Sequence, residues 1–222
     1  SGLNDVLVKK TFRMNTLQVI RDSIDKGAWA TSIDLSDAYF HIPIHHKSRK
    51  YLCFQVNNTR FWFRALPFGL STAPWVFTCV MASIKVWGRG QTTLIFQYID
   101  DWLMAGPSPE VVHAQTQAVI NQCVRLGLKV NLKKSEITPS QNIVFLGSLL
   151  HLQEGKVYAT AERLDAIETA ITTLEGSHPA SLKQAESLLG LLIATEKSVL
   201  LGRTYLRDFQ SCVRHALRSE EH

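Results

Sequence analysis

Short apolar runs alternate with longer amphipathic segments over the first two thirds of the chain. The short runs are rich in β-branched and aromatic side chains, which predicts strands. Such runs cover 29–33, 51–56, 60–66, 92–98, 102–105, 143–150 and 156–158. Helical spacing of apolar residues and capping signals predict helices over 14–26, 71–87 and 109–126.

Turn residues join several of these strands into hairpins. Asn57-Asn58-Thr59 separates one pair of strands and Gln153-Glu154-Gly155 another. The rest of the chain is wholly helical, over 161–174, 181–195 and 202–218. We therefore expect an α+β chain, with a mixed domain of about 150 residues followed by a small helical one.

The composition is that of a globular protein and says little about a partner. The 222 residues are 45% hydrophobic and 19% charged, which suits one large domain or two small ones. Lys and Arg number 24 against 19 Asp and Glu, a net charge of +5. A basic excess of this size is compatible with a polyanionic partner but is weak support for one.

The cysteines, histidines and apolar runs bear on the compartment and on metal sites. Scattered cysteines with apolar neighbours predict buried free thiols in a reducing compartment. These are Cys53, Cys79, Cys123 and Cys212. Neither a signal peptide nor a membrane-length apolar run is visible, so we expect an intracellular protein of the cytoplasm, the nucleus or both. His41 and His45 have the spacing of helical zinc ligands, but Pro43 between them breaks a helix, so no zinc site is expected.

Two adjacent carboxylates, Asp100 and Asp101, lie at the tip of the apolar run 93–97. Adjacent acids repel and lose hydration when a sheet buries their flanks, so a fold retains them mainly where a cation neutralises them. Mg²⁺ prefers carboxylate oxygens and is the obvious cation. An ordinary acidic hairpin turn explains the pair about equally well when the pair is taken alone.

A third acid, Asp34, directly follows the apolar strand 29–33. If this strand neighbours the one that leads to Asp100, the two acids converge on one patch. Such a patch supplies ligands for two divalent ions, which in nucleotidyl transfer activate a 3′ hydroxyl and stabilise the departing pyrophosphate.

Four motifs carry a resemblance to a known family. They are Asp34-Leu35-Ser36-Asp37-Ala38-Tyr39-Phe40, Leu66-Pro67-Phe68-Gly69, Tyr98-Ile99-Asp100-Asp101 and Phe145-Leu146-Gly147. Their order and spacing are those of reverse transcriptases, and the resemblance covers nearly the whole chain. The chain resembles the polymerase of LTR-type retroelements, and it is most similar to DIRS-like retrotransposons in 33–44, 187–192 and 201–203.

The resemblance implies a right-hand polymerase palm, an antiparallel sheet with helices on one face, with partial fingers and a helical thumb. It places the start of the palm, with a remnant of the fingers, in 1–43 and a fingers hairpin in 44–67. The palm with its Asp-Asp and primer-grip hairpins would follow in 68–158, and a helical thumb or connection in 159–222.

The resemblance also implies a set of metal ligands. Asp34 and Asp100 would be the metal-binding pair, and Asp101 would be the third catalytic acid and a further member of the metal site. The backbone carbonyl of Leu35 would complete the shell of one metal. The implied cofactor is a pair of Mg²⁺ ions, which Mn²⁺ can replace.

Three of the residues that follow Asp34, namely Asp37, Ala38 and Tyr39, would contact the incoming nucleotide. The backbone amides around Asp37 and Ala38 would face the triphosphate, as successive amides do in anion-binding nests. Tyr39 matches the family's aromatic gate, whose ring leaves no room for a 2′ hydroxyl and so favours deoxynucleotides. An ordinary core aromatic is the alternative for Tyr39.

A loop and a lysine would complete the nucleotide site. Phe68, which stands where retroviral enzymes use Gln, would pack against the nucleotide, and Gly69 would let the backbone approach it. A plain loop before a helix is the alternative. Lys134 is the candidate for the lysine near the pyrophosphate, as a general acid or a charge clamp. Lys133 stays open as the alternative, and a solvated surface lysine fits either position.

Two further groups would hold the nucleic acid. The hairpin residues Phe145, Leu146 and Gly147 would hold the primer terminus, and Arg49 and Lys50 would flank the template path. An amphipathic edge hairpin and a solvated basic surface are the respective alternatives.

The implied function is RNA-directed DNA polymerisation, the transfer of dNTPs onto a primer paired to an RNA or DNA template, with no membrane partner. We expect the intact polypeptide to be larger, with early fingers and a ribonuclease H domain, and this segment to polymerise poorly without those fingers. The alternative is a catalytically incompetent, retroelement-derived module that binds nucleic acid or acts as a scaffold. The 66–69 loop and the helical C-terminal third speak against a nucleotidyl cyclase, and Tyr39 speaks against an RNA-synthesising polymerase.

Overall fold

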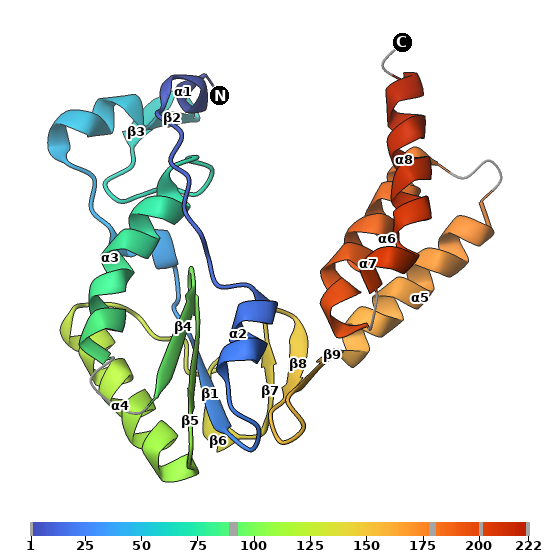
Figure 1. The fold of residues 1–222 in the computed structure, drawn as a ribbon. Coiled ribbons are helices and arrows are strands. Elements are labelled where there is room, and N and C mark those ends of the chain that lie inside the picture. The colour runs from blue at the N-terminus through green and yellow to red at the C-terminus, as the bar shows by residue number, and fades with distance from the viewer. Residues whose placement is uncertain (1, 89–92, 178–180, 200–201, 221–222) are drawn as a thin grey trace. The chain divides into compact units, whose positions relative to one another are not determined.

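The computed structural model of the chain forms two compact units (Figure 1). It describes residues 2–88, 93–177, 181–199 and 202–220. Unit 1 comprises Ser1–Thr16 and Ala28–Ser140, and unit 2 comprises Leu17–Gly27 and Gln141–His222. Thr92, where the fourth strand was expected to begin, lies outside the described residues.

Unit 1 is built on a four-stranded antiparallel sheet with the strand order β4-β5-β1-β6. Its strands are β1 (Trp29–Asp34), β4 (Leu94–Tyr98), β5 (Asp101–Gly106) and β6 (Glu136–Ser140). After Asp101 every residue of β5 is buried, which explains its unbroken apolar sequence. The expected antiparallel sheet is confirmed, and the two acid-bearing strands β1 and β5 are neighbours.

Helices α3 (Ala73–Gly88) and α4 (Pro109–Arg125) pack against each other and against this sheet, on one of its faces (Figure 1). The core between them includes the fully buried side chains of Phe77 on α3, Val119 on α4 and Trp102 on β5. Ser108 caps α4, because its hydroxyl accepts the N–H of Val111.

The remaining elements of unit 1 are short. They are α1 (Leu3–Val6), the 3₁₀ helices η1 (Ala38–His41) and η2 (His46–Tyr51), and the hairpin β2 (Cys53–Val56) and β3 (Thr59–Trp62). Asn57 and Asn58 form the hairpin turn with positive φ angles, as the sequence predicted. Every residue of both strands is exposed, and Phe54 stacks on Phe61 with 5.6 Å between ring centroids.

Unit 2 combines a second antiparallel sheet with helices. The sheet has the strand order β7-β8-β9, with β7 (Asn142–Phe145), β8 (Ser148–His151) and β9 (Lys156–Ala159). The helices are α2 (Leu17–Ser23), α5 (Ala161–Glu175), α6 (Leu182–Thr195), η3 (Glu196–Ser198), α7 (Gly202–Tyr205) and α8 (Arg207–Glu220). Helix α6 packs against both α5 and α8, which confirms a helical C-terminal third.

Several elements differ from the sequence expectation. The run 143–150 is the hairpin β7–β8, which turns at Leu146 and Gly147 with φ angles of +50° and +67°. The apolar run hides this turn because leucine rarely adopts the left-handed conformation. Strand β6 and helix α1 were not expected, and α2 is shorter than 14–26.

The expectation of buried thiols is wrong for three of the four cysteines. All four are free, but Cys53, Cys79 and Cys212 are exposed. Cys123 is buried, and this burial raises its pKa to about 11. Apolar neighbours in sequence are a poor guide on an exposed hairpin or an amphipathic helix, where adjacent residues face different directions.

No helix within the described ranges combines the length and the hydropathy that a membrane span needs.

Candidate active site

The turn between β4 and β5 consists of Ile99 and Asp100. Ile99 has a φ of +52°, and such strain costs a β-branched residue about 1–3 kcal/mol. Two hydrogen bonds hold the turn in this form. Trp102 Nε1 donates to the Ile99 carbonyl over 3.2 Å, and the N–H of Leu35 donates to the Asp100 carbonyl over 3.0 Å. The turn therefore holds Asp100 at the end of the sheet.

The register of β1 and β5 places Asp34 directly opposite Asp101. Directly opposed residues of antiparallel strands lie on the same face, with Cβ atoms about 5 Å apart. The sequence predicted that Asp34 and Asp100 converge. The structure brings all three acids to one end of the sheet, with Asp101 as the cross-strand partner of Asp34.

Residues 129–131 pair with residues 34–36 along the other side of that chain segment. Two hydrogen bonds of 2.8 Å, one on each side of Leu35, join the two segments. Leu35 directs its own N–H and C=O to the opposite side, because both groups of one residue in an extended strand share a side. Its N–H meets the Asp100 carbonyl there, so its C=O also lies on the side of the acid pair.

The three acids and one lysine interact electrostatically. Burial, followed by the charges of Asp100 and Asp34, raises the pKa of Asp101 from 3.8 to about 6, and the charge of Lys134 partly offsets this rise. Lys134 is itself exposed, yet its charge acts on Asp101. The raised pKa marks a place where a bound cation would relieve repulsion.

Asp101→Asn is expected to raise the melting temperature of the metal-free protein at about pH 7.5 by about 2–4 °C. Between 3.8 and about 6 the folded protein binds more protons than the unfolded chain, so wild-type stability falls as pH rises through this window. Because Asp101 is half-buried, solvent screening leaves about 1 kcal/mol of this effect. Thermal unfolding across the window measures it.

Asp165→Asn, which removes an exposed acid of α5, controls for the change in net charge and should leave the melting temperature unchanged. An Asp101→Asn protein that is less stable than the wild type at about pH 7.5 would contradict the electrostatic interpretation of this cluster.

Tyr39 packs into the core on one side and meets the acid cluster on the other. Its side chain is 8% exposed, and its ring lies edge-on to Phe77 with 5.7 Å between centroids. Burial, then the charge of Asp100, raises the pKa of its hydroxyl. Phe68 is 61% exposed, and its ring lies 4.9 Å from that of Tyr39 and 5.4 Å from that of Phe40. The structure thus joins the Tyr39 and Phe68 motifs into one aromatic surface.

Backbone conformation distinguishes the two turns beside this surface. Asp37 is left-handed with φ +57° and precedes η1, where Ala38 is buried. Gly69 has φ +83°, and a Cβ placed on it would meet nothing within 4 Å. The left-handed backbone conformation at position 69, rather than a lack of space for a side chain, therefore explains why this residue is glycine.

The expected template residues already have partners within unit 1. Arg49 Nε donates to the Ile44 carbonyl over 3.0 Å, and Lys50 Nζ lies 5.0 Å from the centre of the Tyr51 ring. Both belong to η2, which precedes the exposed hairpin β2–β3.

The expected primer-grip residues lie in unit 2, at the β7–β8 turn. Phe145 is buried, whereas Leu146 and Gly147 form the left-handed turn itself. A Cβ on Gly147 would overlap the Arg163 guanidinium, but that group lies at the end of a flexible side chain and can move aside, so the φ of +67° is what favours glycine at this position.

Sequence reasoning missed two polar side chains that support the site. Ser135 Oγ accepts the N–H of Asp34 over 3.0 Å and donates to the Asn131 carbonyl over 2.7 Å. Asn4 Nδ2 donates to the Gly69 carbonyl over 2.8 Å, and its Oδ1 accepts the Ser71 N–H over 2.9 Å. Each joins segments distant in sequence, and no local pattern signals such contacts.

The acid cluster fits a magnesium site that a substrate completes. No three His, Cys, Asp or Glu side chains in the described ranges form a ready-made metal cage. Mg²⁺ at phosphoryl-transfer sites is usually held by one or two carboxylates, while substrate phosphates and waters supply its other ligands. The side chains of Asp34, Asp100 and Asp101 and the Leu35 carbonyl offer oxygen donors of that chemical type at this end of the sheet.

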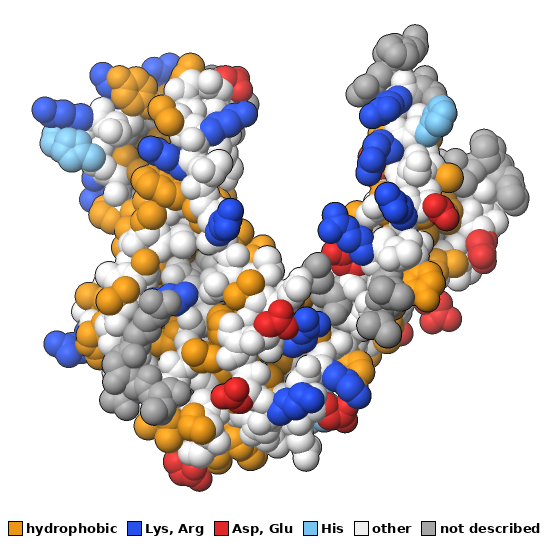
Figure 2. Space-filling view, viewed as in Figure 1, with side chains coloured by type: hydrophobic (Ala, Val, Ile, Leu, Met, Phe, Trp, Pro, Cys, Tyr) orange, Lys and Arg blue, Asp and Glu red, His pale blue; other side chains and the backbone are white. Residues whose placement is uncertain are grey.

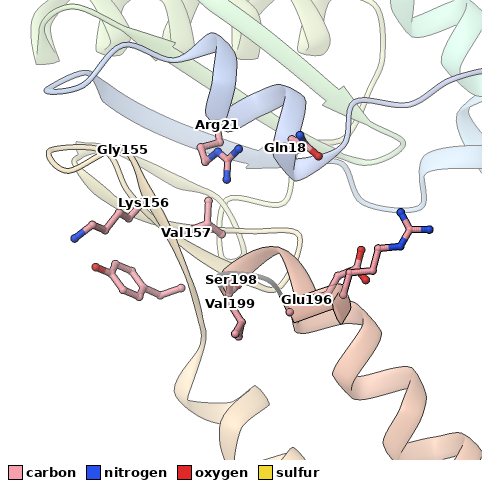
Figure 3. A pocket seen from close by; sticks show the side chains of 11 residues that line it. Gln18, Arg21, Gly155, Lys156, Val157, Glu196, Ser198 and Val199 are labelled. Carbon is pink, nitrogen blue, oxygen red and sulfur yellow. The ribbon is translucent and has the colours of Figure 1, made fainter. Parts of the chain in front are cut away.

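A cavity of about 590 Å³ lies within unit 2 (Figure 3). Arg21 projects into it from α2, and Lys156 and Val157 of β9 and Glu196 of η3 also line it. None of the expected site residues lines this cavity, and its charges have both signs, so we do not assign it to the chemistry of the acid cluster.

Comparison with sequences of known proteins identifies relatives among viral polymerases. The Gag-Pro-Pol polyprotein of Human T-cell leukemia virus 3 (strain 2026ND) is 32% identical over 192 residues, which are 82% of this chain and 12% of the polyprotein. Protein P of Duck hepatitis B virus (strain United States/DHBV-16) is 29% identical over 139 residues, which are 59% of this chain and 16% of that protein. The chain therefore spans only a small part of the length of these relatives.

Solved structures share the fold. The foamy viral protease-reverse transcriptase dRH in complex with double-stranded DNA matches 96% of this chain and 35% of its own, with a TM-score of 0.77 and 21% identity. The foamy viral protease-reverse transcriptase in complex with an RNA/DNA hybrid matches 91% of this chain and 26% of its own, with a TM-score of 0.71 and 20% identity.

A family model covers more than half of the chain, including all three acids, Tyr39 and the Phe68 loop. It is described as reverse transcriptase (RNA-dependent DNA polymerase), and it matches residues 4–150. The chain belongs to the reverse transcriptase family.

Proposed function

We propose that this chain is the catalytic core of an RNA-directed DNA polymerase, which transfers nucleotides from dNTPs to the 3′ end of a primer on an RNA or DNA template. The register that sets Asp34 opposite Asp101, with Asp100 in the adjoining turn, carries the proposal. Membership of the reverse transcriptase family supports the same reaction. Incorporation of one deoxynucleotide on a primed RNA template by the purified chain tests it.

In this proposal Asp34 and Asp100, with the Leu35 carbonyl, hold two Mg²⁺ ions, which Mn²⁺ can replace. Bound metal supplies Lewis-acid chemistry, which lowers the pKa of the primer 3′ hydroxyl and neutralises charge on the departing pyrophosphate. Asp101 adds the third negative charge that draws cations to the cluster, and the nearby Lys134 balances charge on the pyrophosphate side.

The nucleotide would lie against the aromatic surface beside the acids. Amides around Asp37 and Ala38 face its triphosphate, and the Tyr39 ring excludes a ribose 2′ hydroxyl. The exposed Phe68 ring packs against the nucleotide from the same surface. The open space at Gly69 leaves the backbone accessible there.

The primer and template are the proposed partners. The two foamy viral structures are complexes with double-stranded DNA and with an RNA/DNA hybrid, which supports a duplex ligand here. Figure 2 shows basic side chains following one another along α7 and α8 of unit 2. Arg203, Arg207 and Arg214 line a pocket there. We assign the primer terminus to the turn Phe145-Leu146-Gly147 and the template path to Arg49-Lys50.

Affinity for a primed template is expected to fall about 10³-fold between 50 and 200 mM salt, as for proteins that contact about six phosphates. Arg207→Gln should lower the slope of log affinity against log salt by about 1, because it removes one phosphate contact. Fluorescence anisotropy measures both. Arg125→Gln, at the exposed end of α4, is the matched control. An affinity that does not change with salt would exclude this binding mode.

We also propose the origin of the chain, an LTR-type and specifically DIRS-like retrotransposon whose larger polypeptide includes a ribonuclease H domain. The runs 33–44, 187–192 and 201–203 support this subtype. Strong binding of primed template without any nucleotide incorporation would instead favour a catalytically incompetent module that binds nucleic acid or acts as a scaffold.

A further inference from the structure

His41 makes two hydrogen bonds with backbone groups that lie far apart in sequence. Its Nε2 accepts the N–H of Lys129 over 3.0 Å, and its Nδ1 lies 3.2 Å from the Ala38 carbonyl oxygen. A backbone amide only donates and a carbonyl only accepts. The ring is therefore the neutral tautomer that carries its proton on Nδ1.

Lys129 anchors both ends of one short segment. Its carbonyl accepts the N–H of Ser36 over 2.8 Å, and its N–H donates to His41. The first and last residues of segment 36–41, Ser36 and His41, are therefore both hydrogen-bonded to Lys129. Asp37, which lies between the two anchors, is left-handed and is not a glycine, so the surrounding structure has to hold this conformation.

The bond from His41 to Ala38 also sets the direction of a peptide group. The Ala38 carbonyl and the Tyr39 N–H belong to one planar trans peptide unit and point in opposite directions. Holding the carbonyl at the imidazole therefore turns the Tyr39 N–H away from it. The bond from the Lys129 N–H to His41 Nε2 fixes the end of η1, which carries the Tyr39 ring and the Phe40 ring that contacts Phe68.

We propose that His41 is a positioning residue for the incoming deoxynucleotide. It fastens the turn 36–41 to Lys129 and thereby places the amides after Asp37 and the ring of Tyr39. It contacts neither the acids nor the reacting atoms and acts through these groups. The inference rests on the proposed polymerase function, because the amides and the ring are assigned there to the triphosphate and the sugar.

Single-nucleotide kinetics with variants of His41 tests the role. His41→Leu retains bulk and loses both hydrogen bonds, and it should raise the KM for dNTP about tenfold while kcat stays within about twofold. His41→Gln offers one donor and one acceptor on its amide and should recover most of the loss. His113→Leu, which removes an exposed histidine of α4, should leave KM unchanged. A Leu variant with wild-type KM, or a Gln variant as impaired as the Leu variant, would overturn the proposal.

Amide hydrogen exchange at Lys129, followed by NMR, needs no catalysis. Exchange should be about tenfold faster in His41→Leu than in the wild type and should be slowed again in His41→Gln. Unchanged exchange in His41→Leu would overturn the proposal even if the chain extends primers. Faster Lys129 exchange in His41→Leu, together with a wild type that incorporates no nucleotide, would support the structural role of His41. It would count only against the proposed polymerase function.

Discussion

Asp100→Asn is expected to lower the rate of single-nucleotide incorporation by about 10²–10³-fold, the effect of removing one group that stabilises charge in the transition state. The substitution retains the shape of the side chain. It also leaves the Asp100 backbone carbonyl to accept the Leu35 N–H, so the turn should persist. The loss would therefore come from charge that no longer holds a cation. Single-turnover incorporation with excess enzyme measures the rate of this step.

Asp165→Asn provides the matched control, since it removes an exposed acid from α5 and should leave the rate unchanged. Thermal unfolding of both variants shows whether each is folded. An Asp100→Asn enzyme that is folded and retains more than about a tenth of the wild-type rate would remove Asp100 from the metal site.

Tyr39→Ala is expected to reduce discrimination between a deoxynucleotide and its ribonucleotide by about 10–10²-fold. The Tyr39 ring is held between Phe77 in the core and the exposed Phe68, so it cannot easily move aside for a 2′ hydroxyl. Its removal opens that space. The ratio of kcat/KM for dNTP to kcat/KM for rNTP, measured with the same preparation, reports the change.

Two features keep this measurement interpretable. Deleting a buried aromatic ring costs about 3–5 kcal/mol of stability, but the ratio for one preparation does not depend on how much of it is folded. Tyr39→Phe keeps the ring and should retain wild-type discrimination. Unchanged discrimination in Tyr39→Ala would leave Tyr39 as a core aromatic only.

The strands and their acids could be predicted from sequence because each acid follows a buried apolar run. Asp34 and Asp100 end such runs, so placing them at one end of a sheet requires only that the strands be neighbours. The exact partner of Asp34 depends on the register of β1 against β5, and the β4–β5 turn decides where β5 begins. That turn contains Ile99 in a conformation that isoleucine rarely adopts, so composition does not reveal the register.

Long-range polar contacts were not predictable. Asn4, Ser135 and His41 support the site through backbone groups that lie 65 to 101 residues away. Their residue types are common at surfaces and carry no periodic signal. The same limit explains the hidden β7–β8 turn, where Leu146 looks like the middle of a strand.

Metal-dependent incorporation of one dNTP on a primed RNA template, compared between the wild type and Asp34→Asn, tests the proposed metal centre most directly. We expect the wild-type product to rise with Mg²⁺ to saturation and to disappear with a chelator. We expect Asp34→Asn to give almost no product at any Mg²⁺ concentration, although its thermal unfolding shows that it is folded. Wild-type activity that survives chelation, or an Asp34→Asn enzyme as active as the wild type, would contradict a metal centre built on these acids.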